Sequence, residues 1–326
     1  MKKGLLLINL GTPNSPSLYE VGKYLQQFLC DKRVIDLPKI FRYLLFFGLI
    51  LPFRLQKTVQ AYKRIWTKKG SPLLVNSKAL HKALQLKLQG QYEVKLAMRY
   101  GEPSLENALR LLKDCDEITI LPLYPQYASA STGSSLEAIF NYFSKQHNIP
   151  SLRIIHEFYE HPGFIEAQVA SIKPYLNDHA FILFSYHGLP EQQVLQSGCV
   201  SICKEACPST AKNTCYRARC FHTTKLIAQS LKLKASTFDT SFQSRLGCIP
   251  WIQPYTEAHL ATLSARGIKR LLVVAPSFTA DCLETMDEIG YLAQETWLKH
   301  GGEKLTLVSS LNGSEVWVEG IIQMIK

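Results

Sequence analysis

The sequence predicts an α/β protein with two similar domains, each a mostly parallel four-stranded sheet flanked by helices. Apolar, β-rich runs alternate along the chain with amphipathic stretches, and this alternation is typical of parallel sheets. Several runs are apolar throughout, as expected for strands that are buried on both faces. The turn-forming stretch Asn148-Ile149-Pro150 favours a boundary near the middle, so we expect domains at residues 1–150 and 151–326.

Eight runs are expected to form strands. The first begins close to the N-terminus, where the apolar stretch is better explained as a strand than as a signal peptide. Helices between the strands are clearest at 104–115, 135–146 and 164–176, where apolar residues recur at helical spacing. The predicted strands are Gly4–Leu10, Val94–Tyr100, Ile118–Leu123, Arg153–Phe158, Phe181–Ser185, Thr237–Gln243, Leu271–Ala275 and Leu305–Ser309.

Composition and charge indicate a globular protein with one basic segment. A hydrophobic content of 46% with 19% charged residues is typical of globular chains. Residues 21–100 contain 16 Lys and Arg against 3 Asp and Glu, whereas the whole chain has a net charge of +11. The longest apolar stretch, 43–53, is shorter than the roughly 20 residues of a membrane-spanning helix. The basic segment suggests contact with an anionic membrane surface or an acidic ligand, or else a solvated basic face; no nucleic-acid motif accompanies it.

Polar side chains follow several predicted strands. The second strand ends in Arg99 and Tyr100, and the fifth leads into His187 at the carboxyl edge, where open α/β sheets bind ligands. After the seventh strand, a helix carries Glu284 and Glu288 on one face. An imidazole with two carboxylates can hold a divalent metal transiently, and the arginine suits an acidic ligand. The ordinary alternative is a capped core histidine beside acids that complement a helix dipole.

The cysteines are concentrated in one short segment. Without a secretory signal, a metal or cluster site is a better explanation than a disulfide framework. Thiolates suit zinc or an iron–sulfur cluster, but the tight C-x2-C pairs of structural zinc sites are absent. A helix is expected to follow from His222. Five of the nine cysteines of the chain lie here: Cys199, Cys203, Cys207, Cys215 and Cys220.

Seven stretches of the chain resemble the ferrochelatase family, whose members insert ferrous iron into a porphyrin. They are LLLINLGTPNSP, YKRIWTKKGSPLLVNS, MRYGEPS, PLYPQYASASTGSS, FSYHGLP, QSRLGCIPWIQPYTE and SFTADCLETMDEI. Together they cover essentially the whole chain in the family's order, so the resemblance is specific. It implies two Rossmann-like, chelatase-type domains with a porphyrin cleft between them.

The resemblance also implies roles for single residues. His187 matches the histidine of the family's HG(L)P motif, and Glu284 matches its acidic partner. Both are expected to handle the Fe²⁺ substrate or to accept a pyrrole proton, in either order of roles. Binding in the cleft is expected to bend the macrocycle and expose its nitrogens. The further residues expected to bind substrate are Arg99, Tyr100, Trp251 and Glu288.

The implied reaction is insertion of ferrous iron into protoporphyrin IX to form protohaem, with release of two protons. Residues 21–38 and 46–53 resemble the family's hydrophobic lip, which favours protoporphyrin over the more acidic coproporphyrin. A cytoplasmic protein with peripheral contact to a membrane surface is expected, and no nucleic-acid partner. Oligomeric state, iron donor and haem acceptor are not readable from the sequence.

The segment 198–221 resembles a cysteine insertion of some bacterial ferrochelatases, which carry a [2Fe–2S] cluster. A cluster takes four thiolates. Cys215 and Cys220 are expected among them, then Cys207, and either Cys199 or Cys203 as the fourth. Zinc and redox-active thiols are the alternatives. The expected role is stability, because the insertion has too few apolar residues to fold alone; iron or redox sensing is the other possibility.

Two other functions compete with this one. A related chelatase would insert cobalt or nickel into another tetrapyrrole, but the lip-like segment argues against it. A haem- or iron-binding sensor would need neither His187 nor Glu284. Turnover separates these functions, because a sensor binds its ligand stoichiometrically and an enzyme releases product.

Overall fold

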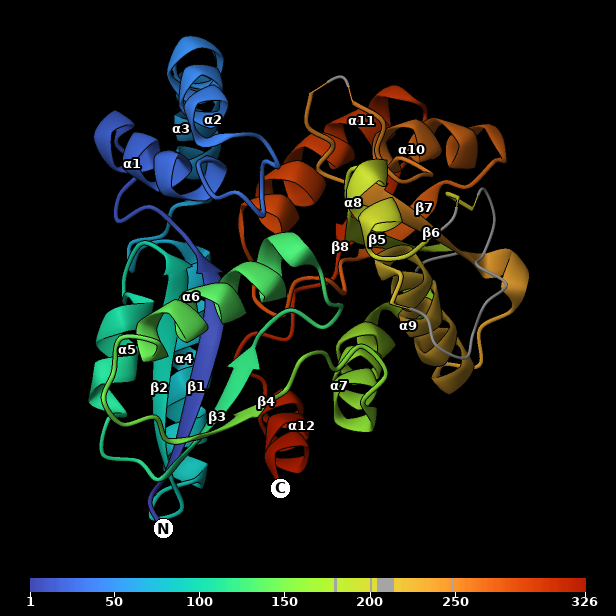
Figure 1. Cartoon of the computed structure of the whole chain (residues 1–326). Helices are drawn as coiled ribbons and strands as arrows, with labels where there is room; N and C mark the ends of the chain where they lie inside the picture. Colours follow the sequence, from blue (N-terminus) through green and yellow to red (C-terminus); the bar gives the residue numbers. More distant parts are fainter. Residues whose placement is uncertain (179–180, 200, 204–213, 248) are drawn as a thin grey trace. The chain divides into compact units, whose positions relative to one another are not determined.

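The computed structural model describes residues 1–178, 181–199, 201–203, 214–247 and 249–326 (Figure 1). These residues form two compact units. The first unit is Met1–Glu157 with Asn312–Ser314 and Ile325–Lys326, and the second is Phe158–Leu311 with Glu315–Met324. Each unit contains one four-stranded parallel sheet, so the predicted fold class is confirmed. The division into domains after residue 150 stays a prediction.

The sheet of the first unit has the strand order β2-β1-β3-β4. Its strands are β1 (Lys3–Gly11), β2 (Tyr92–Tyr100), β3 (Glu117–Pro122) and β4 (Ser151–Ile154). The central strand β1 is wholly buried from Leu5 to Ile8, which explains its unbroken apolar run. The last strand ends at Ile154 and not at Phe158 as predicted. Strand β4 pairs with β3 alone, and this pairing stops at Ile120 of β3.

Helices cover both faces of the first sheet. Apolar residues of α5 and α6, such as Leu109 and Ile139, pack with Leu6 and Ile120 in one core cluster. On the other face, α4 packs against β1 and β2. The helix α5 begins where predicted, because the Ser104 side chain caps it, but it ends before residue 115. The helices are α1 (Leu18–Leu29), α2 (Lys39–Leu45), α3 (Leu51–Ile65), α4 (Pro72–Lys87), α5 (Leu105–Leu111) and α6 (Ser134–Phe143), with π-helical turns at Phe46–Ile50 and Ser129–Gly133.

The apolar stretch 43–53 lies in a continuous helical region from α2 to α3. Within the π-helical turn, Phe46 and Ile50 are buried, but neighbouring large apolar side chains face solvent. In the described part of the chain, no helix is long and apolar enough to cross a membrane. We call the exposed set the apolar patch: Leu37, Ile40, Phe41, Tyr43, Leu44, Phe47, Leu49 and Phe53.

The second sheet repeats the order of the first, as β6-β5-β7-β8. Its strands are β5 (Phe181–His187), β6 (Phe238–Gln243), β7 (Arg270–Val274) and β8 (Lys304–Leu307). Leu260, Ile289 and Trp297 pack one group of helices onto the sheet, and α9 packs against β6. The helices are α7 (Pro162–Ile172), α8 (Glu191–Gln196), α9 (Tyr216–Ser230), α10 (Thr256–Ala265), α11 (Gln294–Lys299) and α12 (Glu315–Ile325), with a π-helix at Glu284–Ala293 and 3-10 turns at Lys173–Asp178 and Ala235–Thr237.

The helix after the cysteine segment starts earlier than predicted. It was expected from His222, but α9 begins at Tyr216. Tyr216, Arg217 and Cys220 are all buried, so packing of this first turn outweighs the absence of a side-chain cap. Cys220, the last cysteine of this segment, therefore lies on a helix of the second unit.

Candidate functional site

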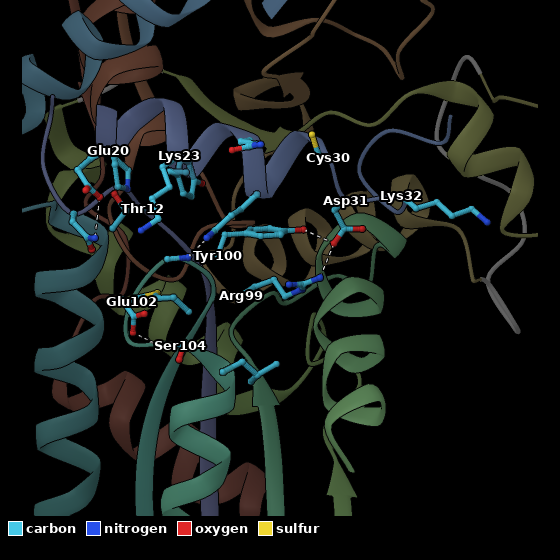
Figure 2. Close-up of a pocket in the computed structure, with 18 of the residues that line it drawn as sticks. Thr12, Glu20, Lys23, Cys30, Asp31, Lys32, Arg99, Tyr100, Glu102 and Ser104 are labelled. Carbon is cyan, nitrogen blue, oxygen red and sulfur yellow. Dashed lines mark hydrogen bonds and ion pairs between the residues drawn. The ribbon is translucent and has the colours of Figure 1, made fainter. Parts of the chain in front are cut away.

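A polar pocket of about 620 Å³ lies at the carboxyl ends of β1 and β2 in the first unit (Figure 2). The helix α1 forms one wall, and its Gln27 side chain accepts a hydrogen bond of 2.9 Å from the Gly101 amide. Arg99 and Tyr100 line the pocket beside Asp31; their binding of a substrate at this edge of the sheet stays a prediction.

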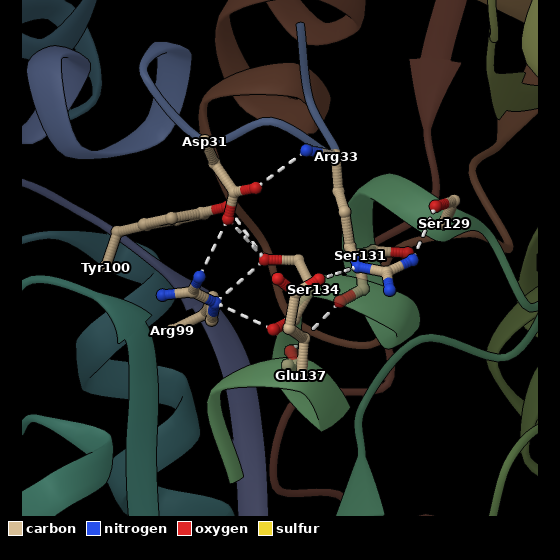
Figure 3. A network of polar contacts seen from close by, with 9 residues as sticks. Asp31, Arg33, Arg99, Tyr100, Ser129, Ser131, Ser134 and Glu137 are labelled. Atoms are coloured by element: carbon tan, nitrogen blue, oxygen red, sulfur yellow. Dashed lines mark hydrogen bonds and ion pairs between the residues drawn. The ribbon is translucent and has the colours of Figure 1, made fainter. Parts of the chain in front are cut away.

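Asp31 is the centre of a hydrogen-bond network in this unit (Figure 3). Its Oδ2 accepts bonds from Arg99 Nη2 at 2.7 Å, Tyr100 Oη at 2.8 Å and Ser134 Oγ at 2.7 Å. Its Oδ1 accepts the Arg33 amide at 2.8 Å. Arg99 is held again through Nε, which donates to Ser134 Oγ at 2.8 Å. One carboxylate thus fixes both predicted residues.

The network sets the charge of these groups. Burial raises the pKa of Asp31, but hydrogen bonds from Ser134, the Arg33 amide and Tyr100, and then the charge of Arg99, leave that pKa below its usual range. Burial raises the pKa of Tyr100, and the neighbouring Asp31 adds to the rise. The result is an ion pair of Arg99 and Asp31 beside a neutral phenol.

In the second unit, His187 is the last residue of β5, at the carboxyl edge of the sheet. Its side chain is partly buried, and its Nδ1 lies 2.6 Å from the Gly188 carbonyl oxygen. The Trp251 ring centroid lies 6.4 Å away. A Cβ at Gly188 would come within 3.2 Å of the Trp251 ring, so the glycine makes room for the indole.

The predicted acidic residues lie on a π-helix rather than an α-helix. Glu284 begins this helix, and its carbonyl accepts a 2.8 Å bond from Gln243 Nε2. Glu288 accepts the Ser244 amide at 2.6 Å and the Ser244 hydroxyl at 2.5 Å. Ser244 has a φ of 66°, which is uncommon without glycine and typical of functional sites. π-Helical turns are themselves frequent at functional sites.

Glu288 is electrostatically coupled to the other predicted residues. Burial raises its pKa, and the hydrogen bonds from Ser244 oppose this rise. The charge of His187 also lowers this pKa, while that of Glu284 raises it. Glu288 therefore holds a proton more readily than an exposed glutamate, and the charges of His187 and Glu284 act on it in opposite directions.

Comparison with known proteins identifies the family. A ferrochelatase family profile matches residues 2–326. A protein named ferrochelatase from Legionella pneumophila (strain Paris) is 51% identical over 323 residues, which cover 98% of each chain. One of the same name from Coxiella burnetii (strain Dugway 5J108-111) is 44% identical over 334 residues, covering 100% of this chain and 93% of the relative.

The chain belongs to the ferrochelatase family.

Solved structures support the fold. The sirohydrochlorin chelatase SirB from Bacillus subtilis subspecies spizizenii, in complex with cobalt, matches with a TM-score of 0.54 at 13% identity, covering 99% of this chain and 93% of that one. At this identity the likeness concerns the fold alone. The chelatase-type architecture expected of a ferrochelatase family member is thus confirmed.

The structure describes four of the five cysteines that are predicted to bind an iron–sulfur cluster. Cys199 and Cys203 are partly buried, Cys215 and Cys220 are buried, and Cys207 lies outside the described residues. Within the described ranges, no three His, Cys, Asp or Glu side chains come together as a metal site. Burial raises the pKa of Cys220. A hydrogen bond with Tyr216 and the charges of the buried Arg217 and Arg219 oppose this rise.

Four site residues were not found from the sequence: Asp31, Ser134, Gln243 and Ser244. Asp31 was counted within the basic segment, and the side chains that bond to it lie 68 to 103 residues away along the chain. Gln243 ends β6 and Ser244 follows it, just as Arg99 and Tyr100 end β2. Comparing the strand ends of the two halves would have identified this second pair.

Proposed function

We propose that this protein is a ferrochelatase, which inserts ferrous iron into protoporphyrin IX, forms protohaem and releases two protons. The observation that carries this proposal is the match to the ferrochelatase family over residues 2–326, with His187 at the carboxyl edge of the second sheet. An imidazole and a carboxylate can accept protons and can bind a divalent ion weakly; the described residues contain no site of three such ligands, so the iron would be held only transiently.

In this proposal, His187 and Glu284 handle the iron and the pyrrole protons. Glu288 holds a proton more readily than usual because burial raises its pKa. It can therefore receive a proton from the reaction and pass it on to solvent. Trp251 lies beside His187 and is 7% exposed, so we assign it to packing against that histidine rather than to a broad contact with the substrate.

Arg99 and Tyr100 serve the substrate differently. The Arg99 side chain is 22% exposed and lines the pocket, so it can contact a ligand. Tyr100 is 3% exposed and its hydroxyl is bonded to Asp31, so we assign it to support of Arg99. Asp31 neutralises the charge of Arg99. The pair is therefore better suited to contact the macrocycle of a porphyrin than to bind an anionic group.

The test is an anaerobic turnover assay with ferrous iron and either protoporphyrin or coproporphyrin. We expect many turnovers with protoporphyrin and fewer with coproporphyrin. His187→Ala should abolish insertion and leave porphyrin binding, measured by fluorescence quenching, largely intact. Stoichiometric binding without turnover by the unmodified protein would overturn the proposal in favour of a sensor. Insertion of cobalt or nickel but not iron would identify a different chelatase.

We further propose that four of the five clustered cysteines bind a [2Fe–2S] cluster. The donor chemistry fits: Cys215 and Cys220 are buried at the start of α9, and the charges of Arg217 and Arg219 between them oppose the rise that burial gives to the pKa of Cys220. Cys207 and one of Cys199 and Cys203 would complete the set. The cluster would supply a cross-link that holds this segment folded. Iron and acid-labile sulfide in equal amounts are expected in anaerobically purified protein; zinc without sulfide would contradict this.

The apolar patch is proposed to contact a membrane surface. Its support is the exposure of Ile40 and Phe53, at 73% and 75%, within the basic segment of the chain. Apolar side chains among cations suit the interface of an anionic bilayer, from which a hydrophobic porphyrin can enter the enzyme.

A further inference from the structure

The end of β5 lacks a neighbouring strand on one side. Pairing of β5 with β7 stops at Phe184 and Val274, three residues before His187. On the opposite side, Gly188 still donates a 2.8 Å bond to the Gln243 carbonyl of β6. Successive residues of a strand alternate between its two edges, so the amide and carbonyl of His187 face the side that β7 has left. These two polar groups need other partners.

Two side chains replace the missing strand. The His187 amide donates to Ser277 Oγ at 3.2 Å, and the Tyr216 hydroxyl donates to the His187 carbonyl at 2.8 Å. The two hydroxyls lie 3.2 Å apart. With Ser277 donating to Tyr216, the three bonds close a ring in which every group both donates and accepts. The Tyr216 side chain is buried, so water does not compete readily for these bonds.

We propose that Tyr216, with Ser277, is a positioning residue for His187 and connects that histidine to the cysteine segment. The orientation of the imidazole depends on this backbone, because its Nδ1 lies 2.6 Å from the Gly188 carbonyl oxygen. Tyr216 follows Cys215 directly and contacts Cys220 one turn later. The hydroxyl that holds His187 is therefore carried by the first turn of α9, between these two cysteines. This inference rests on the proposed iron insertion, in which His187 takes part.

The test compares two buried tyrosines of the same unit. Tyr216→Phe removes the hydroxyl that holds His187. Tyr186→Phe is the matched control, because Tyr186 is wholly buried and its hydroxyl bonds to Thr224 at 2.9 Å rather than to His187 or Ser277. Both variants should lose a few degrees of melting temperature. Only Tyr216→Phe should also lose kcat, by about tenfold, with KM for porphyrin and porphyrin binding unchanged.

A second substitution checks the same contact. Ser277→Ala should give the same loss of kcat at constant KM, and the double variant should lose little more than either single one. Equal kcat in Tyr216→Phe and Tyr186→Phe, whether unchanged or lowered to the same extent, would overturn the positioning role. In the second case Tyr216 would be a structural residue only. Failure of the proposed function is distinct, because the unmodified protein would then show no turnover.

Discussion

At the scale of single residues, Asp31 is the carboxylate that joins Arg99, Tyr100 and Ser134 in the first unit. Asp31→Asn keeps the shape of the side chain but removes the charge that balances Arg99. The two side chains are 10% and 22% exposed, so the remaining guanidinium is poorly compensated by water. We expect a loss of about 2–3 kcal/mol in the free energy of unfolding, measured by calorimetry. The exposed Asp114→Asn should change it by less than about 0.5 kcal/mol.

The same substitution predicts a pH dependence. The pKa of Asp31 in the folded protein lies below its unfolded value of about 3.9. Its contribution to stability is therefore complete above that value and is lost as pH falls through the folded pKa. The difference in stability between the unmodified protein and Asp31→Asn should be constant between pH 5 and pH 8 by this reasoning, and it should shrink only below about pH 4. A difference that grows on acidification would contradict this assignment.

Ser244 controls the ionisation of Glu288. Its hydroxyl stabilises the carboxylate, so Ser244→Ala should raise the pKa of Glu288 further. If the ionised form is required for iron insertion, the acid limb of the kcat profile should move up by about one pH unit. Ser244→Gly should show the same movement, because it also lacks the hydroxyl. The glycine variant should be about 1 kcal/mol more stable than the alanine variant, since φ is positive here. An unmoved profile in both variants would exclude Glu288 as the titrating group.

At the scale of elements, strands were predictable from the sequence and helix ends were less so. The strands are continuous apolar runs such as Leu5–Ile8, and burial on both faces leaves few other structures for them. The first turn of α9 was missed because tertiary packing of polar and cysteine residues created it. The π-helix at Glu284–Ala293 was also missed, because the acidic spacing fits an α-helix equally well. Local sequence does not contain the distant contacts that decide these cases.

Gly11 tests how closely the strand ends are packed. It pairs with Tyr100 of β2, and a Cβ there would lie 1.8 Å from the Tyr100 carbonyl oxygen at a φ of 114°. Gly11→Ala should therefore cost more than about 3 kcal/mol or prevent folding. Gly48→Ala is the matched control: it is helical, no atom beyond its chain neighbours and its own helix backbone lies within 4 Å of its Cβ position, and a gain of up to about 1 kcal/mol is expected. Equal melting temperatures for the two variants would contradict this packing.

At the scale of the whole molecule, the two units repeat one plan. Both sheets share a strand order, and equivalent bonds close the loops after equivalent strands. Met98 donates to the Pro103 carbonyl at 2.7 Å, and Phe242 donates to the Pro254 carbonyl at 2.8 Å. This repeat is difficult to detect in the sequence because the loop after β6 is longer than the loop after β2. The longer loop contains Trp251.

One consequence of this plan concerns the apolar patch, which extends from Leu37, just before α2, through the π-helical turn to Phe53 in α3. If it contacts a bilayer, the protein should sediment with phosphatidylglycerol vesicles more than with phosphatidylcholine vesicles, and added salt should weaken the binding. Replacing Ile40, Phe41 and Phe53 together by serine should reduce binding at least tenfold, because each removes roughly 1.5–3 kcal/mol of apolar burial.

A matched control separates this surface from apolar exposure in general. Phe140 of α6 is 50% exposed, yet it lies outside the basic segment, so Phe140→Ser should leave vesicle binding unchanged. The triple variant should keep its turnover with porphyrin supplied in detergent, because its defect concerns delivery from the bilayer. Equal binding to both kinds of vesicle, or an equal loss in the Phe140 variant, would mean that the patch has no specific affinity for an anionic membrane. The exposed side chains would then belong to the substrate entrance alone, and turnover in detergent should fall in the triple variant.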